Sequence, residues 1–587
     1  MKLKILFFAL LCCATVNLNA QGDKAKWAKF LGGDFEVGGP ALEHTGPAQF
    51  NNVIVDGDFI IANGWYEYIA CWNGEILPSS DGKNGIVAKL DLDGNVIWTS
   101  IITGTGVPSG FFEIAVDSNG DIIAIGHHFS EDEFFINGEQ VSEASVELFT
   151  RAYVAKFSGE DGSLIWYQEA RADGTLAISR LTLDEEGNIY GAGYYGLNLG
   201  SECEDFTIGG ITIPFEEVYS NSIFYFKMNN EDGTCEWINT WKALEDIPGT
   251  YLTPRSIDTK NGQLYLGFSA EGGMAIDGTE HIGNNLGILK ISMSNGAISD
   301  HIVFGGDERE RGQNIAHLKI DDDDNVAVSG FFTVASNFRI GEFTLPGNTQ
   351  AIALGSFHDG FVAKFNADLN PLWANAIGGP YTDRAFNIEI TPNGYISVAG
   401  GFDPDAPLMY NGRALTSRVS TGLSMFQLFV DKDGVFKDIY TLYVGDGGST
   451  FTNSMTVTHP SGRTYTAGCW LGNANILDPT GELETQDHEK GFIMEWDRQL
   501  DVTSIKNINV GNASVSVYPN PFVDELTVKM NEESAIKIEI KDLTGRLVYS
   551  SDFNNDQTIN LSSLNKGIYI LTVKGQGVES ATKIIKR

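Results

Sequence analysis

Short apolar stretches joined by turn residues recur along residues 21–500. One phrase places two apolar stretches around an Asp/Asn/Gly turn, and its clearest copies are Gly85–Trp98, Ala152–Trp166, Ile223–Trp237 and Gly360–Trp373. A second phrase of the same kind alternates with it, with copies at Phe112–Gly126, Ile178–Gly193, Ala316–Gly330 and Asn387–Gly400. Each phrase predicts a β-hairpin, because a tight turn between two apolar runs is typical of that structure.

The repeat length predicts the architecture. Copies of the first phrase begin roughly 70 residues apart, and two hairpins per repeat over seven repeats indicate a seven-bladed β-propeller. The last copy, at Gly491–Asp497, supplies a third strand with no fourth strand after it. Residues Lys26–Gly33 match the fourth-strand phrase Leu372–Gly379, so we expect the N-terminal strand to complete the last blade and to remove two exposed edges.

The connections between strands differ on the two expected faces. Turns within hairpins are short and acidic, whereas connections between second and third strands are long, and several contain a short hairpin of their own: Phe134–Val141, Phe206–Ile213 and Phe338–Leu345. Long loops on a compact repeat are typical of a binding face. The repeats resemble propeller repeats of bacterial surface proteins, a resemblance that indicates fold more than function.

Most second strands end on a glycine followed by aromatic residues. This step predicts a ring of aromatic side chains at the long-loop face, where ring faces stack on sugars or on a partner protein. The candidate ligand platform is Trp65, Tyr66, His128, Tyr195, Phe332 and Trp470. The alternative is that one member of each aromatic pair packs between blades as core.

The composition excludes some partners. Asp and Glu number 77 against 39 Lys and Arg, which gives a formal net charge of −38. Such a chain repels nucleic acid and anionic lipid, so neither is an expected partner. No motif of a known catalytic class is present, so no catalytic residue is predicted. We expect a non-enzymatic module that binds a glycan or a protein. The alternatives are a secreted polysaccharide hydrolase and a structural surface-layer component.

Acidic turns raise the question of calcium. Three turns have the first ligand positions of an EF-hand loop: Asp91, Asp93 and Asn95; Asp117, Asn119 and Asp121; Asp321, Asp323 and Asn325. Each lacks the glycine at position 6 and the glutamate at position 12 of that loop. Hairpin turns explain these residues better, so no cofactor is predicted and calcium is kept as the alternative.

The N-terminus predicts export. Lys2 and Lys4 precede an apolar run from Ile5 to Ala14, and the pattern indicates a signal peptide over residues 1–20, cleaved between Ala20 and Gln21. Cys12 and Cys13 offer a lipoprotein as the alternative, which Leu11 disfavours. No later run is long enough for a transmembrane helix.

Four cysteines remain after cleavage. In an oxidising compartment we expect disulfides, and three connectivities are possible. We favour Cys203–Cys235, which are close in sequence, and Cys71–Cys469, which lie in blades that would be neighbours in a closed ring.

The last 75 residues differ from the repeats. Ile536, Ile538 and Ile540 alternate with charged residues, and turn residues punctuate about seven short strands, so residues 513–587 predict a small immunoglobulin-like β-sandwich. The propeller is expected over 21–501, joined to this domain by a linker over 502–512.

This segment resembles the type A C-terminal sorting domain of the type IX secretion system of Bacteroidota. The residues that carry the resemblance are Pro519, Asn520, Pro521, Gly545, Arg546, Gly567, Tyr569, Lys583 and Lys586. The resemblance implies the type IX secretion machinery as a partner. It also implies passage through the periplasm to the outer-membrane surface or the medium.

Overall fold

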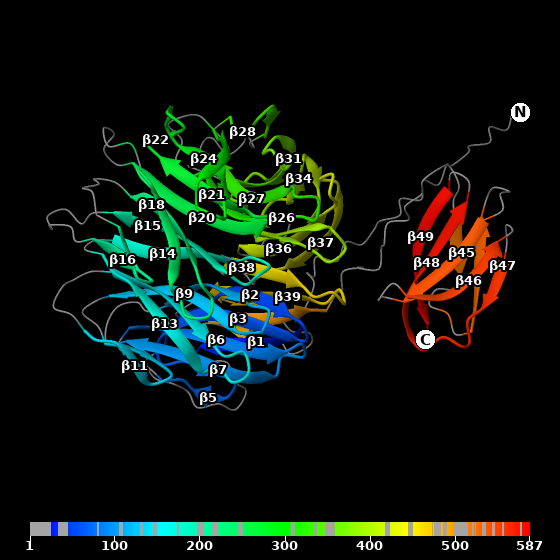
Figure 1. Cartoon of the computed structure of the whole chain (residues 1–587), viewed down its shortest axis with the longest axis horizontal. Helices are drawn as coiled ribbons and strands as arrows, with labels where there is room; N and C mark the ends of the chain where they lie inside the picture. The colour runs from blue at the N-terminus through cyan, green and yellow to red at the C-terminus, as the bar shows by residue number, and fades with distance from the viewer. Residues whose placement is uncertain are drawn as a thin grey trace, which may run out of the picture. The chain divides into compact units, whose positions relative to one another are not determined.

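The computed structural model describes residues 25–32 and most of residues 45–497 and 515–586. Every regular element in this part of the chain is a β-strand, numbered β1 to β49 (Figure 1), so the all-β prediction is confirmed. The chain divides into two compact units, one ending at Arg498 and one containing residues 499–587. The described residues include no helix with the length and hydropathy to cross a bilayer. The predicted signal peptide and linker lie outside the described residues.

Seven antiparallel sheets with at least four strands are described in the first unit. Their first strands are β2 (Thr45–Asp56), β8 (Gly110–Val116), β14 (Thr175–Leu183), β20 (Tyr251–Lys260), β26 (Asn314–Ile320), β32 (Arg384–Ile390) and β38 (Thr450–Thr458). The second strands are β3 (Phe59–Tyr68), β9 (Ile122–Phe129), β15 (Ile189–Gly196), β21 (Gln263–Glu271), β27 (Val326–Thr333), β33 (Ile396–Phe402) and β39 (Thr464–Leu471).

The third and fourth strands complete each sheet in the order predicted from the two hairpin phrases. The third strands are β6 (Lys83–Asp91), β12 (Thr150–Phe157), β18 (Ser222–Met228), β24 (Asn285–Ser292), β30 (His358–Phe365), β36 (Ser424–Val430) and β42 (Lys490–Trp496). The fourth strands are β7 (Val96–Gly104), β13 (Leu164–Ala170), β19 (Cys235–Trp241), β25 (Ile298–Phe304), β31 (Pro371–Gly378), β37 (Phe436–Leu442) and β1 (Ala25–Gly32).

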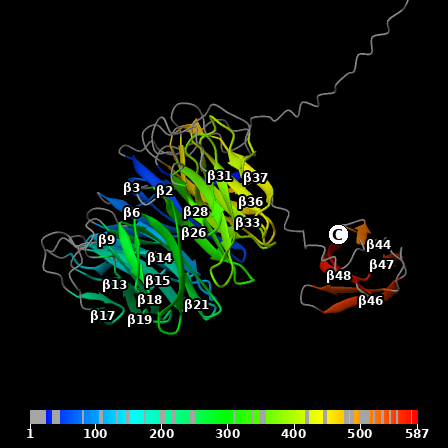
Figure 2. The ribbon, with the colours of Figure 1, turned by 90° about the horizontal axis from the view of Figure 1, so that it is seen from above.

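The first strands contact one another in sequence, from β2 through β8, β14, β20, β26 and β32 to β38. Strand β38 also contacts β2, so the series returns to its start. In Figure 1 the blue strands of the first sheet lie beside the yellow strands of the last, and Figure 2 shows the same succession from above. Apolar side chains of neighbouring sheets share cores; one such cluster joins Phe50 and Ile86 of the first sheet to Tyr465 and Ile493 of the last.

Short hairpins occupy the connections between second and third strands, as predicted. They are β4–β5 (Cys71–Trp72, Glu75–Ile76), β10–β11 (Phe134–Ile136, Glu139–Ser142), β16–β17 (Phe206–Ile208, Ile211–Ile213), β22–β23 (Gly273–Ile276, Thr279–Ile282), β28–β29 (Arg339–Ile340, Phe343–Thr344), β34–β35 (Met409–Tyr410, Arg413–Ala414) and β40–β41 (Asn473–Ala474, Leu483–Glu484). Strands β10, β34 and β4 pair with β7, β31 and β1, the fourth strands of the preceding sheets. Each such hairpin covers an edge that would otherwise be open to pairing.

The N-terminal strand completes the last sheet. Strand β1 pairs antiparallel with β42, with Phe30 opposite Phe492 and Trp27 opposite Glu495, so this prediction is confirmed. The same strand receives the hairpin β4–β5 through Leu31 and Trp72. Strand β1 therefore takes the position that every other fourth strand takes in its own sheet.

Tryptophans of the fourth strands pack on turns of the next sheet. A Cβ on Gly162, whose φ is +74°, would lie 2.7 Å from the Trp98 ring, so only glycine fits this turn. The same contact recurs for Trp166 on Gly233, Trp237 on Gly296, Trp373 on Gly434 and Trp27 on Gly94. The Trp98 indole also donates to the carbonyl oxygen of Gly159 at 3.3 Å.

Lysines of the third strands reinforce these junctions. The Lys89 amine donates to the carbonyl of Gly159 at 2.7 Å, and the Lys290 amine donates to that of Ala367 at 2.8 Å. In the last sheet the matching residue is an acid, Glu495, which is fully buried.

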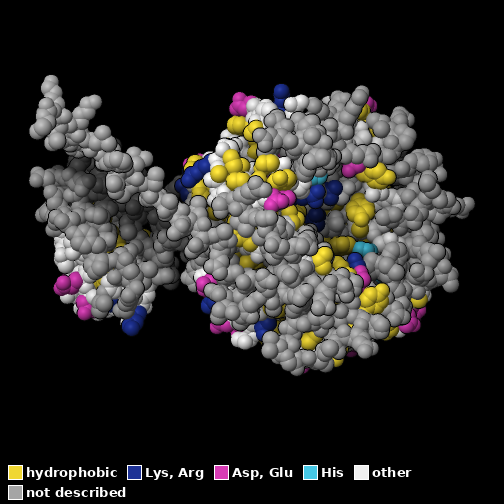
Figure 3. Space-filling model, turned by 180° about the vertical axis from the view of Figure 1, so that it is seen from behind, with side chains coloured by type: hydrophobic (Ala, Val, Ile, Leu, Met, Phe, Trp, Pro, Cys, Tyr) yellow, Lys and Arg dark blue, Asp and Glu magenta, His cyan; other side chains and the backbone are white. Residues whose placement is uncertain are grey.

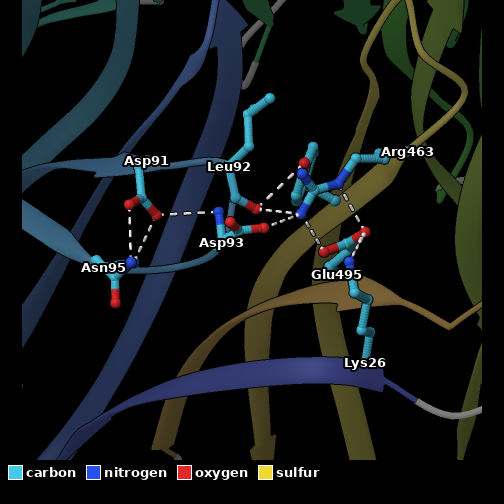
Figure 4. A network of polar contacts seen from close by, with 8 residues as sticks. Lys26, Asp91, Leu92, Asp93, Asn95, Arg463 and Glu495 are labelled. Carbon is cyan, nitrogen blue, oxygen red and sulfur yellow. Dashed lines mark hydrogen bonds and ion pairs between the residues drawn. The ribbon is translucent and has the colours of Figure 1, made fainter.

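Arg463 compensates for that change of charge (Figure 4). It binds the two oxygens of Glu495 at 2.8 and 2.6 Å, and Lys26 approaches the same carboxylate at 3.3 Å. Arg463 also reaches the carbonyl of Leu92 at 2.6 Å and Asp93 at 2.8 Å, both in the β6–β7 turn of the first sheet. We call Lys26, Arg463, Glu495, Leu92 and Asp93 the seam network.

The expected Cys71–Cys469 disulfide is not present, which corrects the prediction. The sheet order β39-β42-β1-β4 places two strands between these cysteines. Three strand spacings amount to roughly 14 Å, whereas disulfides need Cα atoms within about 7 Å. Cys235 is a free thiol that donates to the carbonyls of Lys227 and Trp237 at 3.3 and 3.4 Å. The Cys203–Cys235 prediction therefore also fails for Cys235, and Cys203 lies outside the described residues.

The acidic turns are closed by their own hydrogen bonds. One oxygen of Asp91 accepts the backbone N–H groups of Asp93 and Asn95 at 2.9 and 2.8 Å, and the Asn95 amide donates to the other oxygen at 2.7 Å. Asp117 and Asp321 accept the matching bonds in their turns. The hairpin-turn interpretation of these residues is confirmed.

The second unit holds seven strands in its described part, in two sheets. One sheet has β43 (Val515–Tyr518), β44 (Glu525–Met530) and β47 (Gln557–Asn560), and the other has β46 (Leu547–Phe553), β45 (Ile536–Asp542), β48 (Gly567–Gly575) and β49 (Val578–Lys586). Leu526 and Val528 of the first sheet and Ile538 and Ile540 of the second belong to one buried core. The alternation of isoleucines predicted this inward face.

Candidate functional site

Each first strand of the first unit carries a β-bulge. At these bulges the pairing with the second strand shifts by one residue in all seven sheets. The residues at the bulges are Asn51, Phe112, Ser179, Arg255, Ala316, Phe386 and the pair Asn453–Ser454. Bulges redirect side chains and are frequent beside binding sites, so the bulge residues are candidates for such a site.

In five sheets the residue after the bulge forms a hydrogen bond with the next first strand. The carboxylate of Glu113 accepts the backbone N–H of Leu181 at 2.7 Å, and the hydroxyl of Ser256 accepts that of Leu318 at 2.9 Å. Similar links run from Arg180 to the carbonyl of Arg255, from His317 to that of Ile388, and from Asn387 to the N–H of Thr456. These bonds hold the first strands of neighbouring sheets in fixed register.

Two bulge residues contact side chains of the second strand in their own sheets. The Phe112 ring stacks on His127 with centroids 4.7 Å apart, and Arg255 Nε donates to Ser269 Oγ at 2.7 Å. Phe112 remains 37 % exposed, so this stacked pair is open to solvent on one side.

Three cations lie beside these aromatic residues. The guanidinium carbon of Arg384 is 5.0 Å from the Phe331 ring centre, and Lys83 Nζ is 4.0 Å from that of Trp65. Both rings are half-buried. The third cation is Arg255, whose electrostatic neighbours include Tyr194 and Arg180. Cations over aromatic faces are held by the ring quadrupole and keep their outer side for a ligand.

Burial alters the titration of this group. The pKa of Arg255 falls to about 10, first because of burial and second because of Arg180. Burial also lowers the pKa of Arg384. His358, which lies 3.1 Å from an Arg384 nitrogen, has a pKa lowered to about 4 by burial and by that guanidinium. His127 has a pKa lowered to about 4 by burial, so both imidazoles are neutral at pH 7.

We define the basic–aromatic mouth as Trp65, Lys83, Phe112, His127, Tyr194, Arg255, Phe331, His358 and Arg384. Figure 3 shows a hollow at the centre of one face of the first unit, with Lys, Arg and His side chains gathered in it beside hydrophobic ones. Lys319 and Arg180 also come from first strands, and both act electrostatically on the carboxyl of Glu113. Side chains from several sheets therefore share one central environment.

The predicted ligand platform requires correction for five of its six residues. Tyr66, His128, Tyr195, Phe332 and Trp470 are at most 5 % exposed, so their ring faces are not open to a ligand. They pack instead on the short hairpins and strands: His128 on Phe134 at 4.3 Å, Phe332 on Phe338 at 4.8 Å and Trp470 on Phe30 at 5.3 Å. Trp65 alone is half-buried. Successive strand residues point to opposite sides. The preceding residues Trp65, His127, Tyr194 and Phe331 are accordingly half-buried, whereas Cys469, which precedes Trp470, is fully buried.

Carboxyl groups inside the first-strand series carry raised pKa values. Burial raises the pKa of Glu389 to about 8, and the N–H of Thr458 donates to this carboxylate at 2.8 Å. Burial likewise raises the pKa of Glu113. No set of three or more metal-binding side chains occurs among the residues that the structure describes.

The sorting residues lie at the ends of strands in the second unit. Gly567 pairs with Lys586 between β48 and β49, and Tyr569 donates to the carbonyl of Asn565 at 2.8 Å. Lys586 is buried and forms an ion pair with Asp524 at 3.0 Å. Arg546 is exposed. Residues 519–521 and Gly545 lie outside the described residues, and the side chain of Lys583 is not described.

Comparison with known proteins identifies the second unit. Residues 516–587 match the secretion system C-terminal sorting domain. This segment is a type IX sorting domain, so the protein is exported to the cell surface or the medium, and the secretion machinery is a partner. A curated relative, the ulvan lyase NLR42 of Nonlabens ulvanivorans, is 35 % identical over 81 residues, which are 14 % of this chain and 15 % of that protein.

Solved structures give weaker matches. A protein of unknown function from Dyadobacter fermentans is 12 % identical, with a TM-score of 0.34 over 66 % of this chain and 94 % of that one. A second protein of unknown function, from Bacteroides caccae, is 10 % identical, with a TM-score of 0.30 over 61 % of this chain and 89 % of that one. Neither likeness carries an argument about fold or activity.

Proposed function

We propose that the first unit is a seven-bladed β-propeller over residues 21–501 that β1 closes. The cyclic contacts of the seven first strands support this closure. The pairing of β1 with β42 and the packing of Trp27 on Gly94 support it further, because both repeat the junctions between the other sheets. A signal peptide over 1–20, cleaved between Ala20 and Gln21, a linker over 502–512 and a sorting β-sandwich over 513–587 complete the proposed organisation.

We infer that the propeller is a non-enzymatic module that binds a glycan or a protein outside the cell. The observation that carries this proposal is the basic–aromatic mouth, where cations lie over half-buried rings on more than one sheet and a stacked aromatic pair is partly exposed. Concave sites with aromatic walls and a few polar groups are typical of ligand binding. Trp65 is the member of the predicted platform that this mouth retains.

The test uses the mature chain, residues 21–587, on a glycan array and in a reducing-end assay. Retention of particular glycans without release of reducing ends supports the proposal. Trp65→Ala should weaken retention, whereas Trp373→Ala, which alters a junction on the opposite side of the strands, serves as the control for folding. Release of reducing ends would indicate a polysaccharide hydrolase. Failure to retain any glycan or any cell-surface protein would favour a structural role in the surface layer.

A further inference from the structure

We propose that the basic–aromatic mouth binds an acidic carbohydrate, a sugar chain that carries carboxylate or sulfate groups. This inference rests on the proposed binding function and adds the chemical class of the ligand. It goes beyond the glycan-or-protein alternative because it predicts selectivity by charge.

The two guanidinium groups of the mouth make their direct contacts with uncharged partners. Arg255 donates to the Ser269 hydroxyl, with Glu271 acting on it only electrostatically, and Arg384 contacts a neutral His358. The third cation of the mouth, Lys83, lies 3.8 Å from the Glu67 carboxylate, so the preference for an anion rests on the two arginines. Other arginines of the described chain do pair with acids, as Arg463 does with Glu495 and Arg151 with Glu169. An anionic ligand would supply the missing partner.

Burial adds to this preference for an anion. The lowered pKa of Arg255 reports that water solvates its charge poorly. A carboxylate or sulfate can accept two parallel N–H bonds from a guanidinium, and these bonds replace the lost solvation. Charge-assisted hydrogen bonds of this kind are about twice as strong as neutral ones. Burial lowers the pKa of His358 and His127 to about 4, so neither imidazole adds positive charge at pH 7 and the cations of the mouth are Lys83, Arg255 and Arg384.

The rings beside the cations favour a sugar over an acidic peptide. Phe331 lies under Arg384, Trp65 lies under Lys83, and Phe112 stacks on His127. A pyranose presents an apolar C–H face to an aromatic ring and carries its acidic substituent at the ring's rim, where the cation lies. Because similar units occur on several sheets, a polymer with a repeated negative charge fits this surface better than a single acidic group.

The net charge of the chain does not oppose this assignment. The acidic turns follow the ends of the first strands; Asp56, for example, ends β2, and the bulge at Asn51 lies five residues before it. Five strand residues span roughly 17 Å, and charges beyond the Debye length of about 8 Å are largely screened at physiological ionic strength. Glu67, 3.8 Å from Lys83, lies within that length, whereas the acidic turns lie beyond it and act only weakly on an anion in the mouth.

The experiment measures the affinity of the mature chain for polygalacturonate, dextran sulfate, neutral dextran and polyglutamate at fixed salt. We expect retention of one or both acidic polysaccharides and none of neutral dextran. Arg384→Gln should weaken binding about tenfold to a hundredfold, the effect of losing one charge-assisted hydrogen bond. The matched control is Arg413→Gln, because Arg413 also lies over a phenylalanine, Phe436 at 5.4 Å, but is exposed on the hairpin β34–β35. Circular dichroism verifies that both variants fold.

Each outcome decides one question. Equal affinity for neutral and acidic dextrans, equal loss in both arginine variants, or no binding to any polysaccharide overturns the inference. Polyglutamate bound as tightly as the polysaccharides would assign the mouth to an acidic peptide instead. Preference for polygalacturonate or for dextran sulfate separates carboxylate from sulfate ligands. If an array retains only neutral glycans, the proposed binding function survives and this inference fails. If reducing ends are released, the non-enzymatic function fails whatever the charge preference.

Discussion

The seam network gives the sharpest test of ring closure. Replacing Arg463 by leucine removes two bonds to Glu495 and the contacts with Asp93 and the Leu92 carbonyl, and leaves the fully buried Glu495 with Lys26 alone. Breaking a buried ion pair by deleting one partner costs about 3–5 kcal/mol. This is a large part of the roughly 5–15 kcal/mol that separates folded from unfolded domains. Arg463→Leu should therefore lower the free energy of unfolding by several kcal/mol.

The assay is urea unfolding of the mature chain, followed by tryptophan fluorescence, because Trp27 and Trp496 both lie beside the seam. Lys437→Leu is the matched control. Lys437 binds Asp431 at 2.8 Å, but it lies on the partly exposed strand β37, where an ion pair contributes about 0–1 kcal/mol. Hydrogen exchange of residues 25–32 should rise in Arg463→Leu and stay unchanged in the control.

A second variant tests the reason for the network. Glu495→Lys combined with Arg463→Leu restores the lysine that third strands carry in other sheets, where Lys89 and Lys290 bind turn carbonyls of the next sheet. We expect the double variant to recover most of the stability that Arg463→Leu loses. If Arg463→Leu costs no more than Lys437→Leu, the seam does not stabilise closure and this reasoning is refuted.

Four other changes have defined outcomes. In urea unfolding, Gly162→Ala should destabilise the fold by about 1–3 kcal/mol more than Gly138→Ala. Both glycines have positive φ, but only Gly162 lies against the Trp98 ring, so equal effects would contradict the tryptophan–turn contact. Phe332→Ala should cost about 3–5 kcal/mol of unfolding free energy as a buried aromatic, and a melting temperature equal to that of the parent would show that it is not core. Because the pKa of Glu389 is raised to about 8, the folded state keeps a proton between about pH 4.5 and 8 that the unfolded state loses. The free energy of unfolding should therefore fall as pH rises through this range, by up to about 1.4 kcal/mol per pH unit. Glu389→Gln should flatten this slope in urea midpoints measured at pH 5, 6.5 and 8. Deletion of residues 513–587 should leave the first unit folded but retained in the periplasm. An immunoblot of the medium checks this, and normal amounts of the truncated protein there would argue against the sorting role.

Local features of the fold were predictable from the sequence. Turn residues between apolar runs located the hairpins, and the alternation of Ile536, Ile538 and Ile540 located a strand of the sorting domain. The match of Lys26–Gly33 to a fourth strand predicted the pairing of β1 with β42, because strand position in a repeat is encoded by the repeat itself. The sorting motifs identified the C-terminal family for the same reason.

Features that depend on strand order or on one extra residue were not predictable. Cys71 and Cys469 occupy neighbouring repeats, yet β42 and β1 lie between them, and only the sheet order shows this. The sequence around a bulge residue such as Arg255 looks like that of any other strand and does not indicate the bulge, although Arg255 lies in the candidate site. The aromatic step gave two adjacent residues, such as Tyr194 and Tyr195, and the sequence did not show which one the short hairpin would cover. In the structure Phe206 stacks on Tyr195, which leaves Tyr194 at the mouth.

The position of β1 has a consequence for folding. Its partner β42 is more than 450 residues away, and pairing over such a distance forms slowly because loop closure must come first. Strand β1 also contacts the first repeat, through Leu31 paired with Trp72 of the hairpin β4–β5 and through Trp27 on Gly94 of the β6–β7 turn, both less than 70 residues away. We therefore expect β1 to pack on the first repeat early in folding and to pair with β42 later. Glu495 of β42 then forms ion pairs with Lys26 of β1 and with Arg463 of its own sheet, so β42 binds an edge that β1 has already formed.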